Sequence, residues 1–181
     1  MLRVYRFGVL LLLLGVLLPA ATLEKMGLEE MAQKSTAIVR ARVTGSYAAA
    51  HGSLIYTHYT VQVAERWKGN DAATLDIVVP GGAAAGLRQS FPGAPRLTSG
   101  KDYVLFLWTG PSGLTHIMGL SQGLFNLKTD EKGELVASRA AAGELILDAA
   151  GRPVKDEAVT LQLNVLRTRI SRAVVSEGGR K

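Results

Sequence analysis

The sequence predicts a mainly β protein: a small closed β-barrel of five or more strands, with a short N-terminal helix and an amphipathic C-terminal helix. Three observations predict this fold. Several short segments alternate apolar and polar residues with the period of two that is typical of half-buried strands. A long segment rich in glycine and proline interrupts these strands, and one apolar stripe of helical spacing lies near the C-terminus. A β-sandwich would contain the same kinds of segments and is the alternative fold.

The first residues predict a secretory signal peptide. Arg3 and Arg6 precede an apolar run of twelve residues at 7–18, and small residues follow. This order favours cleavage after Ala20 or Ala21. Twelve residues are fewer than the roughly 20 that a membrane-spanning helix needs. We therefore expect removal of residues 1–21, which leaves one domain at 22–181.

The segment "TLEKMGLEEMAQKS" predicts a short helix with Thr22 as its cap. Gly27 disfavours the first turn and allows the helix to begin there instead. The period then changes to two, which predicts a hairpin of strands on either side of a turn at 47–53, "YAAAHGS". The segment "ATLDIVV" at 73–79 predicts the next strand.

Residues 80–100 contain three prolines and five glycines and show no periodicity, so they predict a long loop. Loops of this length are uncommon in compact domains and are usually functional or disordered. The nearly continuous apolar run "KDYVLFLW" at 101–108 predicts a central strand that is covered on both faces. Further short strands are expected at 114–119 and 123–129.

Two turns and a helix complete the prediction. Asp130 with Gly133, and Asp148 with Gly151, predict hairpin turns in which glycine has a positive φ. A helix is then expected over about 156–176, with Asp156 or Thr160 as its cap. The expected apolar stripe of this helix consists of Val159, Leu163, Leu166, Ile170 and Ala173.

The composition excludes several mechanisms. The chain has no cysteine, so it has no disulfide, no thiolate metal ligand and no cysteine nucleophile. The formal net charge is +6, and 19 basic and 15 acidic residues remain without Arg3 and Arg6. This mild, diffuse excess favours loose attraction to anionic envelope surfaces and argues against nucleic-acid binding.

The tract "DIVVPGGAAAGLRQS" is the nearest approach to a nucleotide-binding motif. Its glycines at 81, 82 and 86 do not have the G-x-G-x-x-G spacing. Leu87 and Arg88 follow Gly86, in place of the lysine and hydroxyl residue of a P-loop. The tract is therefore interpreted as a loop.

The histidines show no metal or catalytic spacing. His58 and His116 lie on predicted strands, where two histidines can converge, and His51 lies in the predicted turn. No acid flanks any of them as a partner, which favours ordinary half-exposed histidines. No metal-ligating residue is therefore predicted.

The segment "GLSQG" around Ser121 matches G-x-S-x-G, but it joins two predicted strands. A nucleophile elbow instead joins a strand to a helix. The aromatic residues Trp67, Trp108 and Tyr103 lie in apolar runs and are interpreted as core rather than as a stacking platform.

The order of "AIVRARVTGS", "YTVQVAERWKG", "LDIVVPGG", "GKDYVLFL" and "GLSQGLFNL" resembles a group of exported bacterial proteins of uncharacterised function. The resemblance covers residues 25–127 and implies an OB-like barrel of the netrin/TIMP-like kind. It implies no catalytic residue. Netrin-like inhibitors chelate the zinc of metalloproteinases through an N-terminal cysteine. This chain has no cysteine, so only inhibition by another route stays open.

We therefore predict an exported, non-enzymatic binding module of the bacterial cell envelope, periplasmic or extracellular, with no catalytic residues and no cofactor. An envelope protein or a polysaccharide is the expected partner, and neither nucleic acid nor a membrane span after processing is expected. The candidate partner-binding residues, in the 80–100 loop, are Arg88, Gln89, Phe91 and Arg96, since arginine and aromatic residues dominate interface anchors. The alternatives are a divergent serine hydrolase that uses Ser121 with a histidine, and a protease-inhibitor-like barrel without cysteine chelation.

Overall fold

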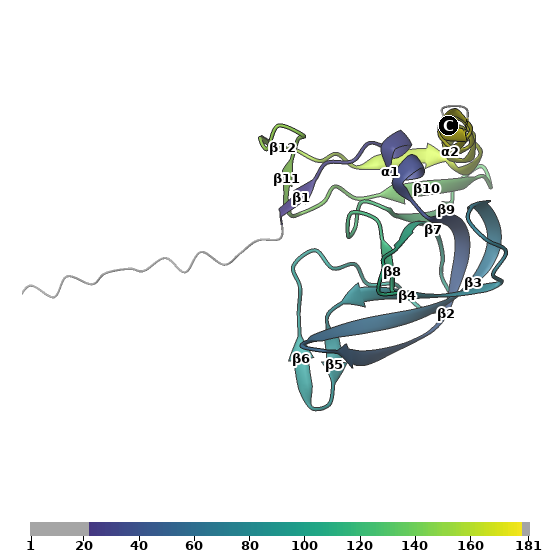
Figure 1. Cartoon of the computed structure of the whole chain (residues 1–181). Coiled ribbons are helices and arrows are strands. Elements are labelled where there is room, and N and C mark those ends of the chain that lie inside the picture. The colour runs from purple at the N-terminus through teal and green to yellow at the C-terminus, as the bar shows by residue number, and fades with distance from the viewer. Residues whose placement is uncertain (1–21, 179–181) are drawn as a thin grey trace, which may run out of the picture.

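The structure, a computed structural model, describes residues 22–178, and the predicted signal peptide at 1–21 lies outside them. The described chain is mainly β, with a short helix near its N-terminal end and a longer one at its C-terminal end, as the sequence predicts (Figure 1). Helix α1 is Leu28–Lys34 and helix α2 is Leu163–Gly178. Within residues 22–178, neither helix is long and apolar enough to cross a membrane.

The described strands form three sheets. The largest sheet contains, in spatial order, β13 (Val159–Gln162), β10 (Leu135–Arg139), β9 (Leu124–Thr129), β7 (Asp102–Thr109), β2 (Ala37–His51), β3 (Leu54–Lys68), β4 (Thr74–Pro80) and β8 (Thr115–Ile117). A second sheet contains β1 (Thr22–Glu24), β11 (Leu145–Leu147) and β12 (Pro153–Val154). A third is the small hairpin of β5 (Gly82–Ala84) and β6 (Leu87–Gln89).

The short strand β8 has a neighbour on each side. His116 pairs in parallel with Val78 of β4, and it also pairs antiparallel with Trp108 of β7. Strand β7 pairs with β2, and β2, β3 and β4 follow as antiparallel neighbours. Each of these five strands therefore has two neighbours among the five.

The hairpin of β2 and β3 is longer than predicted. Residues 47–51 belong to β2, and only the residues between His51 and Leu54 form the turn, so the turn prediction at 47–53 is wrong. The small side chains at 48–50 do not mark a turn; they allow β5 to pack closely against β2. A Cβ atom on Gly82 would lie 3.1 Å from the Ala48 Cβ and 2.8 Å from the Thr57 Oγ1.

The predicted loop at 80–100 is partly ordered as a hairpin. Ala85 and Gly86 between β5 and β6 have φ values of 50° and 75°, the positive values that a two-residue type I′ turn requires. Alanine rarely adopts this conformation, which is why the sequence did not indicate a hairpin here. Further along, the side chain of Leu97 is buried against the core.

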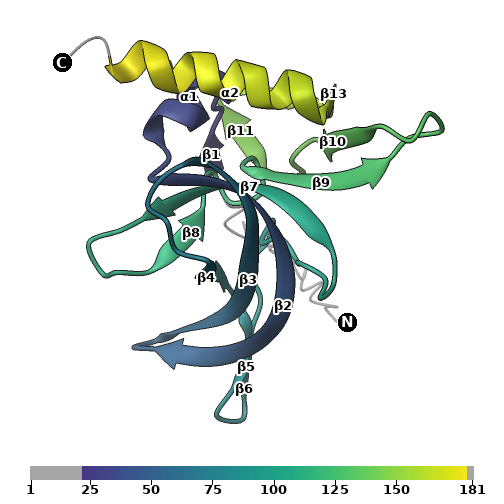
Figure 2. The same ribbon diagram turned by 90° about the vertical axis from the view of Figure 1, so that its right-hand side faces the viewer.

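Two hydrophobic cores lie on opposite faces of β7. Tyr103, Leu105 and Leu107 pack with residues of β2, β3, β4 and β8, whereas Val104 and Phe106 pack with the helices and β9. This confirms the prediction of a central strand covered on both faces. Figure 2 shows α2 lying across one end of the strands, next to α1 and β10.

The C-terminal helix begins later than predicted. Residues 159–162 form β13, which hydrogen-bonds to β10, so a helix from about 156 is wrong, as are the caps Asp156 and Thr160. The free edge of β10 gives this segment a partner that local sequence does not reveal. Four residues of the predicted stripe are buried on α2, and these are Leu163, Leu166, Ile170 and Ala173.

Residues 22–24 form β1, so Thr22 as the cap of the N-terminal helix is wrong, whereas the alternative start at Gly27 is confirmed, since Gly27 is the N-cap of α1. Both hairpin turns are confirmed. Gly133 and Gly151 have φ values of 82° and 76°, and their amides donate to the carbonyls of Asp130 and Asp148.

A buried ion pair fixes the chain as it approaches β13. Arg139 Nη1 lies 2.5 Å from Asp156 Oδ2, and the two side chains are 8% and 2% exposed. Burial by itself raises the pKa of the Asp156 carboxyl. Hydrogen bonds from Arg139 and from the Ala142 amide outweigh this effect, so that pKa lies below its ordinary value.

The substitution Asp156→Asn should lower the free energy of unfolding at pH 7 by about 3–5 kcal/mol, because it leaves the Arg139 guanidinium buried without a counter-charge. The pKa of Asp156 is lower in the folded state, so the stabilisation is present above the unfolded-state pKa and is lost as the pH falls through the folded-state value. Urea unfolding of both proteins between pH 7 and pH 3 should therefore show a difference that shrinks with acidification. Glu30→Gln, which breaks the exposed pair with Lys34, is the control and should cost less than about 1 kcal/mol. An equally small cost for Asp156→Asn would contradict the role of the pair.

Candidate functional site

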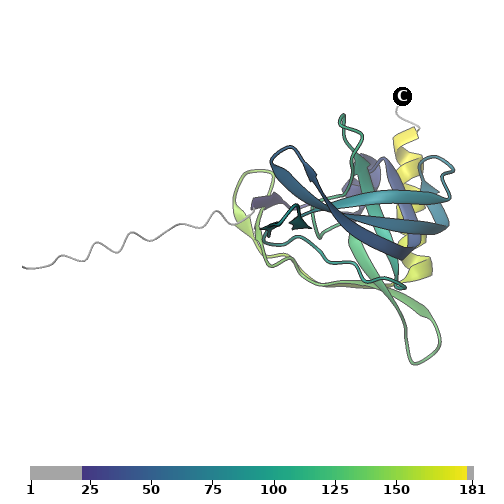
Figure 3. The ribbon, with the colours of Figure 1, turned by 90° about the horizontal axis from the view of Figure 1, so that it is seen from below.

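A pocket of about 380 Å³ lies where the β5–β6 hairpin and the segment after it meet β3 and β4. Its volume is within the range of about 300–1,000 Å³ that is usual for small-molecule sites. In Figures 1 and 2 the hairpin lies at the end of the molecule opposite α2, and Figure 3 views the molecule from that end. The four predicted partner-binding residues all line the pocket, namely Arg88, Gln89, Phe91 and Arg96.

Gln89 holds the hairpin in place. Its Oε1 accepts a hydrogen bond from the Ile55 amide at 2.7 Å, and its Nε2 donates to the Ser53 carbonyl at 2.8 Å. These bonds join β6 to the start of β3, where the edge of β3 leaves backbone groups without a strand partner. Gln89 thus positions the pocket wall, and its amide is already occupied within the chain.

Arg88 and Arg96 are exposed and line the same pocket. Within residues 22–178, no carboxylate forms an ion pair with either of them, and no Asp or Glu side chain lines the pocket. Six of the other eight arginines in the described chain are paired with acids, and these are Arg40, Arg42, Arg139, Arg152, Arg167 and Arg169. The pocket therefore carries two positive charges that the described chain does not neutralise.

Apart from the hydroxyl-bearing Thr57, Tyr59 and Ser90, the rest of the pocket is apolar or formed by small residues. Phe91, Val79 and Pro80 contribute apolar surface, and Pro95 extends it. Phe91 lies close to the backbone, since a Cβ on Gly81 would be 3.6 Å from the Phe91 Cδ2. The site thus suits a ligand with an anionic group and a less polar body.

A second cluster forms where the sequence predicted ordinary histidines. His58 Nδ1 lies 2.7 Å from the Asp76 Oδ2, and His58 Nε2 lies 3.2 Å from the His51 Nε2. His58 is only 4% exposed, so the prediction that it is half-exposed and has no acidic partner is wrong. Asp76 is 18 residues away in the sequence. The register that pairs His58 with Val78 and Thr60 with Asp76 makes them diagonal neighbours.

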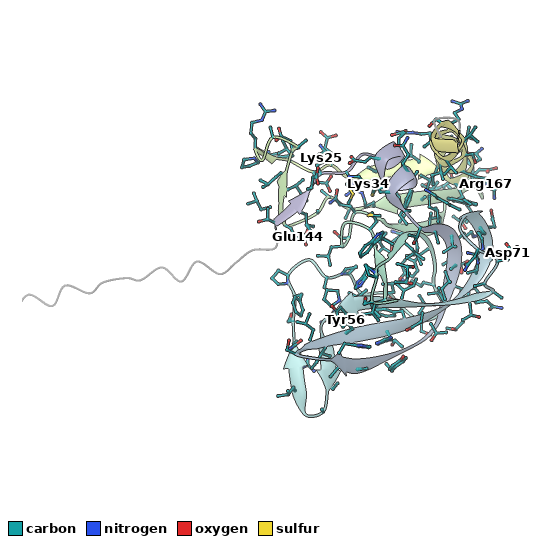
Figure 4. All side chains as sticks on the ribbon, viewed as in Figure 1. Lys25, Lys34, Tyr56, Asp71, Glu144 and Arg167 are labelled. Atoms are coloured by element: carbon teal, nitrogen blue, oxygen red, sulfur yellow. The ribbon has the colours of Figure 1, made fainter. Side chains whose placement is uncertain are left out.

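Aromatic rings extend this cluster across the outer face of the strands. Tyr47 stacks on His58 with ring centroids 4.6 Å apart, and Tyr56 contacts both His51 and His116. In Figure 4, Tyr56 lies in the lower part of the view, far from Arg167 on α2 at the top. Partial burial lowers the pKa of His116 from its ordinary value.

Trp108 lies next to His116 and is 43% exposed, so its prediction as a core residue is wrong. It stands near the end of β7, where the strand leaves the core. Tyr103 is a core residue as predicted, and Trp67 is partly buried against the second core.

The segment around Ser121 is a packed turn. A Cβ on Gly123 would lie 3.1 Å from the Phe106 backbone carbonyl, and Gly119 has a φ of 58°. Gln122 is buried and holds the backbone of Glu24 and Met26. Close packing at Gly123 and the positive φ at Gly119 therefore account for the two glycines of this segment, and no nucleophile elbow is needed to explain them. No hydrogen bond in the described part of the chain joins the Ser121 side chain to a histidine.

No group of three or more histidine, aspartate or glutamate side chains within 22–178 is placed to hold one metal ion. His58 with Asp76 has the form of a general base and its orienting acid. The Nε2 atom that would take a proton from a nucleophile faces His51 instead of a hydroxyl group.

No protein-family model matches this sequence, and no curated protein matches it either.

Replacing Gln89 with alanine should loosen the β5–β6 hairpin, because two hydrogen bonds to the ends of β2–β3 are lost. Hydrogen–deuterium exchange should show faster exchange of the Ile55 amide and of β5 and β6. The control is Arg88→Ala. The side chain of Arg88 makes neither of these hydrogen bonds, so its removal should leave the exchange rates unchanged. Equal rates in Gln89→Ala and wild type would show that the hairpin is held by other contacts.

Proposed function

We propose that the protein is an exported, non-enzymatic binding module of the bacterial cell envelope that takes an anionic ligand at one end of an OB-like barrel. The observation that carries this proposal is the 380 Å³ pocket with Arg88 and Arg96 in its wall, where the part of the chain that the structure describes supplies no carboxylate to pair with them. Unpaired guanidinium groups are strong donors for carboxylate and phosphate. The export itself rests on the predicted signal peptide.

The pairing order supports a closed barrel. In an OB-fold, three strands form a meander, the third lies beside the fifth, and the fourth joins the fifth to the first. Here β2, β3 and β4 form the meander, β8 pairs with β4 and with β7, and β7 pairs with β2. A sandwich would instead leave free strand edges between two stacked sheets. The pairing order therefore favours the barrel.

The position of the pocket also fits a binding role. It lies at the end of the strands farthest from α2, on a segment that a buried Leu97 anchors to the core. Loops on a rigid scaffold present binding groups without loss of the fold. An acidic envelope polysaccharide offers the matching chemistry, since it carries repeated carboxylates on sugar rings that pack against Phe91 and the prolines.

The alternative hydrolase is not favoured. Ser121 lies in a turn that Gln122 and two glycines hold, and no histidine accepts its proton in the described chain. A nucleophile needs a base within hydrogen-bond reach.

A trisaccharide of galacturonic acid should bind the pocket, whereas the uncharged maltotriose should not. Calorimetric titration should show that Arg88→Ala and Arg96→Ala each weaken binding about tenfold or more, since a hydrogen bond to a charged group contributes about 1.5–3 kcal/mol. Added salt should weaken binding further.

Lys132→Ala is the matched control, because it removes the same charge from an exposed hairpin. It should leave the affinity unchanged. Equal binding of the neutral sugar, or equal losses in all three variants, would contradict the proposal.

A further inference from the structure

The side chains of His51 and His58 lie on the same face of the β2–β3 hairpin, because of the alternation along each strand and the register between the two strands. Tyr47 and His51 are four residues apart on β2, and Tyr56 and His58 are two apart on β3. Side chains at even spacing lie on one face of a strand. Tyr47 pairs directly with His58, which brings the two strands' sets together.

The geometry of the two imidazoles is that of two ligands of one ion. Their Nε2 atoms face each other at 3.2 Å. Two nitrogens that each bind one tetrahedral ion at about 2.0–2.1 Å lie about 3.3 Å apart. The separation of the two nitrogens therefore already matches one shared ion, and binding needs a tilt of the rings that directs each lone pair at the ion.

Asp76 completes the arrangement from behind. It accepts a hydrogen bond from His58 Nδ1 at 2.7 Å, so the proton of the neutral ring is on Nδ1 and the Nε2 lone pair points toward His51. A carboxylate on the far nitrogen is the usual companion of a metal-bound histidine, because it fixes the tautomer and the ring orientation.

We propose that His51 and His58 bind a divalent transition-metal ion between their Nε2 atoms, oriented by Asp76 and completed by water. Imidazole pairs suit copper, nickel and zinc, and the order of stability places Cu²⁺ above the others. This site is separate from the arginine pocket.

The surroundings leave room for the ion on one side. Tyr47 covers one face of the His58 ring, with an interplanar angle of 11°, whereas His51 is exposed. Without an ion, the His51 Nε2 proton lies between the two nitrogens. Binding moves this proton to Nδ1 of His51, a change of tautomer with no net loss of a proton.

The chain contains three histidines, so each ring is separately visible in a long-range ¹H–¹⁵N correlation spectrum. Titration with ZnCl₂ should shift the Nε2 signals of His51 and His58 and leave those of His116 in place. Calorimetry with CuSO₄ and ZnCl₂ should give one ion per chain, with Cu²⁺ bound more tightly.

Three variants test the assignment. His51→Ala should weaken Zn²⁺ binding at least tenfold, and Asp76→Asn should weaken it about tenfold, as loss of an outer partner does. His116→Ala, the matched control, should bind as wild type does. His51 and Asp76 are exposed, so these variants should fold, which circular dichroism checks. Absence of binding, wild-type affinity in His51→Ala, or an equal loss in His116→Ala would overturn the proposal.

Discussion

The pairing of β8 with both β4 and β7 is the constraint on which the rest of the structure depends. This strand has only three residues, and its His116 is opposite Val78 on one side and Trp108 on the other. Met118 extends the contact, since its amide donates to the Phe106 carbonyl. Strand β8 thus pairs with both ends of the four-strand run β7, β2, β3 and β4, and the first core lies on one face of these strands.

The opposite face of these strands has two parts. Where β2 and β7 approach α1 and α2, the two helices cover this face and form the second core with it. Trp67, near the end of β3, also packs against the second core, whereas the histidines and aromatic rings lie near the start of β3. Charge is distributed in a similar way. Glu65 and Glu29 pair with Arg167 and Arg169 on α2, whereas Arg88 and Arg96 at the far end have no acidic partner within residues 22–178.

Local pattern was sufficient for much of this fold. Period-two alternation predicted β2, β3 and β4, and a continuous apolar run predicted a central β7. The apolar stripe from Leu163 to Ala173 predicted α2. Composition singled out Arg88, Gln89, Phe91 and Arg96 as candidate partner-binding residues of a loop, because a long segment with two arginines and an aromatic residue is unusual. Neither the pocket that these residues line nor the role of Gln89 as an anchor was predicted.

What sequence reasoning missed depends on contacts between distant residues. Residues 159–162 form a strand because they pair with the edge of β10, and Asp156 forms an ion pair with Arg139 instead of capping a helix. His58 and Asp76 become neighbours only through the register of β3 and β4. Neither pairing has a local signal, although alternation along each strand does indicate that His58 and Asp76 face the same side once the register is known.

The proposed closure of the barrel is tested most directly by nuclear Overhauser effects in the labelled protein. The backbone of β8 should show contacts to Val78 of β4 and, in the same sample, contacts to Leu107 and Trp108 of β7. Both sets together are the result that a closed five-strand barrel predicts. Contacts of β8 with only one of its two neighbours would mean an open sheet and would contradict the account.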